Sequence, residues 1–213
     1  MIKGIIFNCY GTLVHPIENT GATILLEQFE NQEQKNKIKN TLLTEHQPIE
    51  DILETYAIND EDIRQQIIQW FKTDTTTLYD DAKIILDKCY SKDIPFVILS
   101  NISTDYIPDI EHLIGLPYTQ KRDDLFTILY SCQIKYKKPE PQAYQQAIEF
   151  FKNKWIPKEE IIMSWDNKKY DYEEPLKLWI PSIRLDRKGL NTDPNIKTIR
   201  SFDELDLYTH STL

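Results

Sequence analysis

The chain has 213 residues, with 25 Lys and Arg against 34 Asp and Glu, which gives a formal net charge of −9. This length accommodates one core domain with a small insert but no third domain. The negative charge disfavours nucleic acid and anionic membranes as partners, and no apolar run approaches the roughly 20 residues that span a bilayer. Cys9, Cys89 and Cys132 lack metal-type spacing and indicate free thiols. We therefore expect a soluble, cytoplasmic protein whose oligomeric state is open.

The first part of the chain changes from a strand pattern to a helix pattern. In residues 2–8, the side chains of Ile2, Ile5, Ile6 and Phe7 leave almost no polar face, which predicts a central parallel strand that is buried on both faces. From about residue 18 to 77, apolar residues recur every three or four positions, as in amphipathic helices. The polar run 30–40 is expected to be a solvated helix face. The predicted helices of this part span residues 23–29, 37–44, 49–56 and 60–71.

The second part of the chain, after residue 78, alternates between helix and strand patterns. Helices are expected over residues 80–90, 105–114 and 141–152, and strands over 95–100, 125–130, 161–164 and 182–185. This alternation predicts an α/β fold, with a Rossmann-like parallel sheet covered by helices on both faces. Residues 1–15 and 79–213 would form the core domain, and residues 16–78 an inserted helical cap. Ligands of such sheets bind at the carboxyl ends of the strands.

The first predicted strand runs directly into Asn8-Cys9-Tyr10-Gly11-Thr12. This segment resembles the first motif of the haloacid dehalogenase-like (HAD) superfamily, in which a strand ends in Asp-x-Asp-Gly-Thr or, in the dehalogenase branch, Asp-x-Tyr-Gly-Thr. The resemblance places Asn8 at the nucleophile position, makes Tyr10 a catalytic residue, and makes Gly11 and Thr12 substrate contacts. A neutral amide is a very poor nucleophile compared with a carboxylate. We therefore expect little or no hydrolase activity from the chain as written.

Two further segments resemble the second and third HAD motifs. Ser100-Asn101 closes a predicted strand, and in the family a hydroxyl at the place of Ser100 hydrogen-bonds the transferring group, with Asn101 beside the substrate. Lys138 precedes a Pro and a predicted helix, as does the Lys that neutralises the nucleophile and the developing charge. Together with the backbone amides of residues 10–12, Lys138 is expected to bind a small anionic or phosphorylated ligand.

The fourth motif of the family has an acid at a strand end and a second acid about five residues later, a pattern that Asp166 and Asp171 resemble. The resemblance implies a magnesium site formed by Asn8, the carbonyl of Tyr10 and Asp166, with Asp171 supporting the ion or orienting Lys138. With an amide at position 8, the charge of the ion is less well balanced, so magnesium binding is expected to be weak or absent. The four motifs occur in the family's order and span about residues 1–15 and 80–200.

Two features point to different branches of the superfamily. Tyr10 is a poor acid at neutral pH and suits the departure of a halide, which needs no proton. In contrast, Trp165-Asp166 stands where dehalogenases tend to have Ser-Asn, and an acid there favours magnesium and phosphate. The dehalogenases also carry an early cap Arg, whereas residues 15–62 contain none. We therefore rank a magnesium-dependent phosphatase above a 2-haloacid dehalogenase.

Asn8 itself has two interpretations that the sequence leaves open. It is either native, in a pseudoenzyme that binds a ligand or a protein, or an engineered Asp→Asn change that traps substrate. A covalent role for Cys9 is disfavoured, because alternation along an extended segment points it away from Asn8 and Tyr10, and no Arg follows closely to hold a phosphate.

Overall fold

A computed structural model describes residues 2–17, 20–115 and 124–205, apart from the side chain of Trp165. Its helices and strands follow the sequence expectation closely. The helices are α1 (Gly21–Glu27), α2 (Gln32–Thr44), α3 (Ile49–Thr55), α4 (Glu61–Thr73), α5 (Asp80–Ser91), α6 (Ile107–Ile114), α7 (Ser131–Ile134), α8 (Pro141–Lys152) and α9 (Glu174–Lys177). The strands are β1 (Gly4–Phe7), β2 (Phe96–Ser100), β3 (Phe126–Tyr130), β4 (Ile161–Trp165), β5 (Ser182–Leu185) and β6 (Thr198–Ile199).

Six strands of the described residues form one parallel sheet in the order β3-β2-β1-β4-β5-β6. The first strand lies inside the sheet, where Ile6 of β1 pairs with Val97 of β2 on one side and Met163 of β4 on the other. All four residues of β1 are buried, as its continuous apolar pattern predicted. The expected α/β class is therefore confirmed, and the sheet reverses its strand order around β1, where ligands of such folds bind.

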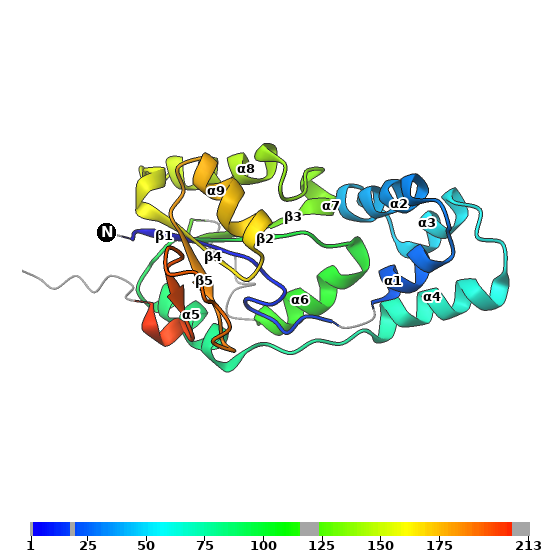
Figure 1. The fold of residues 1–213 in the computed structure, drawn as a ribbon, viewed down its shortest axis with the longest axis horizontal. Helices are drawn as coiled ribbons and strands as arrows, with labels where there is room; N and C mark the ends of the chain where they lie inside the picture. The colour runs from blue at the N-terminus through cyan, green and yellow to red at the C-terminus, as the bar shows by residue number, and fades with distance from the viewer. Residues whose placement is uncertain (1, 18–19, 116–123, 206–213) are drawn as a thin grey trace, which may run out of the picture.

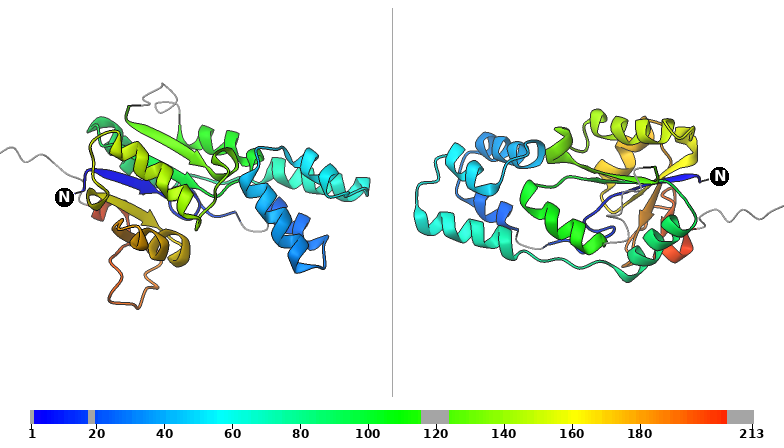
Figure 2. Two further views of the ribbon diagram at one scale, coloured as in Figure 1. Left: turned by 90° about the horizontal axis from the view of Figure 1, so that it is seen from above. Right: turned by 180° about the vertical axis from the view of Figure 1, so that it is seen from behind.

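The two faces of the sheet are covered by different helices (Figures 1 and 2). Alternate residues of β1 point to opposite faces: Ile5 and Phe7 join a cluster that includes the buried residues of α5 and α6, whereas Ile6 joins a cluster with α8. The second cluster includes the fully buried side chain of Phe151 of α8. This packing on both faces holds the carboxyl ends of β1, β2 and β4 at one edge of the sheet.

Helices α1 to α4 lie together beyond the carboxyl ends of the strands (Figure 1). Helix α1 packs closely on α4 at Gly21, where a Cβ atom would come within 2.4 Å of the Phe71 ring. The lack of a side chain at this position permits the close approach. The polar run 30–40 falls mostly in α2, whose side chains there are largely exposed, as expected for a solvated helix face. The predicted cap segment is therefore helical and sits above the strand ends.

Two chain segments connect these helices with the sheet, and they run side by side. Val14 and Leu78 form an antiparallel bridge. Backbone hydrogen bonds join His15 N to Thr77 O at 2.9 Å and Tyr79 N to Leu13 O at 3.0 Å. These backbone hydrogen bonds join the outgoing and returning connections into a short two-stranded ribbon.

Short elements account for the differences from the sequence expectation. Strand β6 has two residues, α7 and α9 have four each, and a π-helix, η4 (Lys169–Glu173), precedes α9. Pieces this short carry too few residues to show an apolar period. Within the described residues, no helix combines the length and the apolar character needed to cross a membrane.

Candidate active site

The side chain of Asn8 lies at the centre of a hydrogen-bond network at the carboxyl end of β1. Its Nδ2 atom donates to Tyr10 O at 2.8 Å and to Asp166 Oδ1 at 2.6 Å. Its Oδ1 atom accepts from Lys138 Nζ at 2.8 Å. An ammonium has only donors and a carboxylate only acceptors, so the network fixes the orientation of the amide. The structure therefore brings residues from the first, third and fourth motifs together.

Lys138 forms a buried ion pair with Asp171, a residue of η4. Their side chains are 3% and 1% exposed, and Nζ lies 2.6 Å from Oδ1. Burial raises the pKa of the Asp171 carboxyl, and the neighbouring Lys138 ammonium opposes the rise. Each charge has its counter-ion, as a buried pair requires. Asp171 thus orients Lys138, which is one of the two roles that the resemblance implied for it.

The side-chain amide of Asn101 binds the backbone of Lys138 and is not free to bind a ligand. Its Oδ1 accepts from Lys138 N at 2.7 Å, and its Nδ2 donates to Lys138 O at 2.8 Å. Because both ends of the amide are used, the structure makes Asn101 a positioning residue, although it lines the cavity where we expected it to contact substrate. The two hydrogen bonds of Asn101 tie the end of β2 to the third motif.

The loop after β1 is a tight turn that uses its own amides. Gly11 N donates to Val14 O and Thr12 N to Cys9 O, so these two amides are not free to hold an anion, contrary to our expectation. Gly11 has a φ of +76°, and a Cβ atom there would lie 2.1 Å from Asp166 Oδ2, so only glycine fits. The hydroxyl of Thr12 is 3.4 Å from Asp166 Oδ1 and adds a weak contact.

Cys9 and Ser100 are buried next to each other below the turn. Burial raises the pKa of the Cys9 thiol to about 12, although the charge of Lys138 and a hydrogen bond with Ser100 act in the opposite direction. A thiol with this pKa is protonated at neutral pH, and only the thiolate is a strong nucleophile. Cys9 is a packing residue, as its alternation along the segment predicted.

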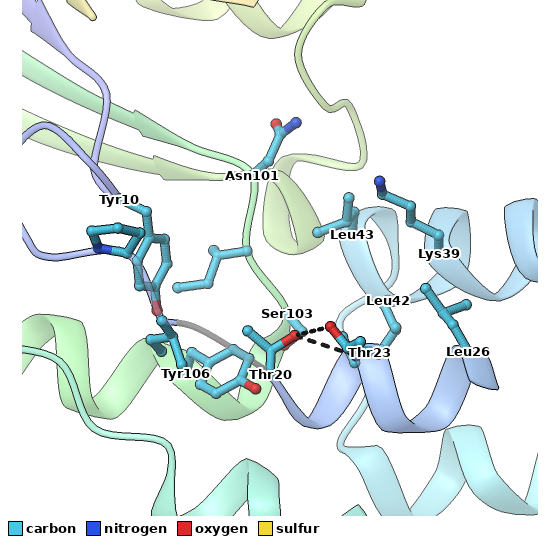
Figure 3. A pocket seen from close by; sticks show the side chains of 14 residues that line it. Tyr10, Thr20, Thr23, Leu26, Lys39, Leu42, Leu43, Asn101, Ser103 and Tyr106 are labelled. Carbon is cyan, nitrogen blue, oxygen red and sulfur yellow. Dashed lines mark hydrogen bonds between the residues drawn. The ribbon is translucent and has the colours of Figure 1, made fainter. Parts of the chain in front are cut away.

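The structure separates the two ends of Tyr10. Its carbonyl accepts from Asn8, whereas its ring extends away from this network toward Tyr106 (Figure 3). Burial raises the pKa of the Tyr10 hydroxyl well above its usual range. Tyr10 therefore holds its proton at neutral pH and is unsuited to be a general acid.

A cavity of about 320 Å³ opens over this network, between the strand ends and α2. Helix α2 contributes Lys39 and Leu43 to its wall. Among the predicted site residues, those that line it are Asn8, Tyr10, Ser100, Asn101, Lys138, Asp166 and Asp171. Gly11 and Thr12, which were expected to contact substrate, are not among its lining residues. The cavity is thus of a size that holds a small metabolite.

Solved structures of other proteins share this architecture, although no family model matches the sequence and no curated protein matches it significantly. A HAD family enzyme from Bacteroides thetaiotaomicron, in complex with magnesium and inorganic phosphate, has a TM-score of 0.62 and 19% identity over 91% of this chain and 98% of that one. A 2-haloacid dehalogenase from Pseudomonas syringae pv. Tomato DC3000 has a TM-score of 0.61 and 15% identity over 96% of each chain. A HAD phosphatase from Thermococcus onnurineus has a TM-score of 0.58 and 15% identity, also over 96% of each chain. The chain has the HAD fold.

The resemblance to the four HAD motifs implied a magnesium site, and the residues present do not fit one with Asn8 as it stands. Two of the expected ligands, Tyr10 O and Asp166 Oδ1, converge on Asn8 Nδ2, a donor that cannot ligate a cation. Turning the amide over would aim its oxygen at them but would point Nδ2 at the Lys138 ammonium, donor against donor. A carboxylate at position 8 has an oxygen on both sides and meets both demands.

Two residues that contribute to this candidate site were not predicted from the sequence. Arg187, two residues after β5, donates to Gly11 O at 3.3 Å, to Thr12 O at 2.8 Å and to Asp81 Oδ1 at 2.7 Å. These hydrogen bonds hold the turn after β1 in place. The position of Arg187 at a strand end was a usable signal. Lys39 of α2 lines the cavity from the cap side, and nothing in its polar surroundings in the sequence distinguished it.

Proposed function

We propose that the chain is the scaffold of a magnesium-dependent phosphatase that acts on a small phosphorylated metabolite, and that Asn8 leaves it inactive or trapped. The observation that carries this proposal is the 2.8 Å contact between Lys138 Nζ and Asn8 Oδ1. It sets a buried ammonium against the residue at the nucleophile position, which is the arrangement that stabilises charge during transfer of a phosphoryl group. Asp166, in place of the dehalogenase Asn, supports phosphate over halide chemistry.

Binding of the anion needs only groups that the chain holds. Lys138 supplies a positive charge, and Ser100 is among the residues that line the same cavity. With Asn8 in place of a carboxylate, one negative charge that would repel a phosphate is absent, so ground-state binding of the anion is favoured. Magnesium belongs in this proposal to a form with Asp at position 8 and binds weakly or not at all to the chain as written.

A second candidate function is a natural pseudoenzyme that binds a ligand or a protein. It is favoured by the complete satisfaction of the Asn8 amide, whose two donors and one acceptor all have partners. A 2-haloacid dehalogenase is the third candidate and rests on Tyr10 alone.

The test is turnover of phosphate monoesters and of 2-haloacids by the chain and by Asn8→Asp. We expect no turnover by the chain and magnesium-dependent phosphatase activity in Asn8→Asp. Strong turnover by the Asn8 form that persists in Asn8→Ala would exclude position 8 as the nucleophile. Phosphate binding without turnover in Asn8→Asp would favour the pseudoenzyme, and haloacid turnover the dehalogenase.

A further inference from the structure

A second cavity of about 330 Å³ lies beside the polar one, between α1, α2 and the loop after β2. Figure 3 shows the side chains that line it. Its wall is mostly apolar and comes from both the cap and the core. Its apolar lining residues include Ile17, Ala22, Leu26, Leu42 and Ile102.

The two cavities share part of their walls and form one cleft with two chemically different ends. Tyr10, Lys39, Leu43 and Asn101 line both of them. The polar end holds Lys138 and the carboxylates, whereas the other end has mainly hydrocarbon on its walls. A ligand that fills the cleft needs a charged end and an apolar end.

Most polar side chains around the apolar cavity already have partners. The hydroxyls of Thr20 and Thr23 lie 3.2 Å apart in a hydrogen bond, and Tyr106 donates to Asp74 at 2.5 Å. Ser103 differs, because it is 4% exposed and its Oγ atom has no hydrogen-bond partner within the described residues. An unpaired buried hydroxyl is costly. A polar atom on an otherwise apolar ligand would satisfy it.

Lys39 stands where the two ends of the cleft meet. Within the part of the chain that the structure describes, its ammonium has no hydrogen bond or ion pair. The neighbouring Lys137 differs, since it contacts Asn40 and lies 3.3 Å from Glu140. Lys39 is therefore available to an anionic group that enters between α2 and Lys138.

We propose that the ligand of this cleft is a phosphate monoester whose organic part is apolar and carries one hydrogen-bonding atom. The inference rests on the proposed function for the phosphate end. The phosphate lies between Lys138 and Lys39, the apolar body fills the cavity between α1 and α2, and the polar atom reaches Ser103. A polar sugar phosphate is disfavoured, because hydroxyl groups would lose their water against this wall without gaining partners.

The experiment is calorimetric titration of the full chain with inorganic phosphate, glycerol phosphate and phenyl phosphate. All three carry the same head group, so differences between them report on the second cavity. We expect phenyl phosphate to bind at least about tenfold more tightly than glycerol phosphate, as burial of an aromatic ring implies. Ala22→Trp should fill the apolar end and remove this preference while inorganic phosphate binds as before.

Glu27→Trp is the matched control, since Glu27 is an exposed residue of the same helix and does not line the cleft. It should retain the preference. Should Ala22→Trp fail to fold, Thr23→Trp, at an exposed position that also lines the cavity, takes its place. Equal binding of the two esters, or a preference that survives the filling variants, overturns the inference alone. Failure of all three phosphates to bind overturns the proposed function and the inference with it.

Discussion

Lys138 Nζ donates to Asn8 Oδ1 at 2.8 Å, while the other side of the same amide donates to Asp166. One neutral side chain thus separates a buried cation from a carboxylate. Its two ends are not interchangeable, because the Lys138 ammonium requires a hydrogen-bond acceptor and the Asp166 carboxylate requires a donor. Replacement of the amide by a carboxylate would leave the Lys138 contact intact and would turn the Asp166 side into a pair of acids. This asymmetry has direct consequences for magnesium.

Asn8→Asp should convert a weak or absent magnesium site into a measurable one. Two carboxylates and the carbonyl of Tyr10 would then face the same space, and oxygen ligands of this kind bind magnesium. Magnesium titration by calorimetry should show binding to Asn8→Asp and little to the chain as written. The double variant Asn8→Asp/Asp166→Ala is the control and should lose the gain. Equal binding by all three proteins would remove Asp166 from the site.

Lys138→Met should lower the free energy of unfolding by about 3–5 kcal/mol, because it leaves the Asp171 carboxylate buried without its counter-ion. Burial already raises the pKa of Asp171, and loss of Lys138 removes the charge that opposes the rise. A carboxyl whose pKa is raised by folding favours the folded state below its unfolded pKa of about 3.9, and this contribution is lost as pH rises. The deficit of the variant should therefore grow as pH rises above about 4.

Denaturant unfolding at several pH values measures this deficit. The double variant Lys138→Met/Asp171→Leu is the control, since it removes both charges together and should recover much of the loss. A deficit that is independent of pH and unchanged in the double variant would show that packing, and not the ion pair, sets the stability.

Arg187→Ala should weaken phosphate binding although Arg187 does not line the cavity and acts on it through the turn after β1. Its guanidinium also stacks on Tyr79, with Cζ 3.6 Å from the ring centre. Loss of its hydrogen bonds to the carbonyls of Gly11 and Thr12 should cost about 1–3 kcal/mol in stability. Arg187→Lys should recover only part, because a single ammonium cannot reproduce the fork. Thermal unfolding and phosphate titration measure both effects, with exposed Arg200→Ala as control; an unchanged phosphate affinity would contradict the positioning role.

All three cysteines should resist alkylation in the folded protein. Cys9, Cys89 and Cys132 are buried, and burial raises the pKa of the first two to about 12. At pH 8 the reactive thiolate is therefore scarce, and it becomes abundant only as pH rises through the pKa. Mass spectrometry after iodoacetamide treatment should show no label in buffer and three labels in denaturant. Rapid labelling of Cys9 in buffer would revive a nucleophilic role for it.

The sequence predicted the sheet well, because the strands of a parallel sheet leave a physical trace in each short segment. Residues such as Ile5, Ile6 and Phe7 must all be apolar when both faces are covered. The positions of Ser100 and Asp166 at strand ends followed from the same logic, and that of Lys138 just before a helix followed from the resemblance to the HAD motifs. These predictions needed only local patterns and their order.

Features that depend on contacts between distant segments were beyond this reasoning. The hydrogen bond from Arg187 to Thr12 joins residues 175 positions apart, and the position of Arg187 after a strand does not identify its partner. The direction of the Asn8 amide depends on the simultaneous placement of Lys138 and Asp166. The apolar end of the cleft likewise requires α1 and the loop that carries Ser103 to line the same cavity.

The paired connections at Val14 and Leu78 determine how the cap can move. A single flexible linker would let the four helices twist and swing freely, but two hydrogen-bonded strands bend most easily across the plane of their ribbon and resist motion within it. Val14 O also accepts the hydrogen bond of Gly11 N, so the ribbon joins directly onto the turn that follows Asn8. The link between the four helices and the sheet is therefore a hydrogen-bonded pair of segments that begins at the site itself.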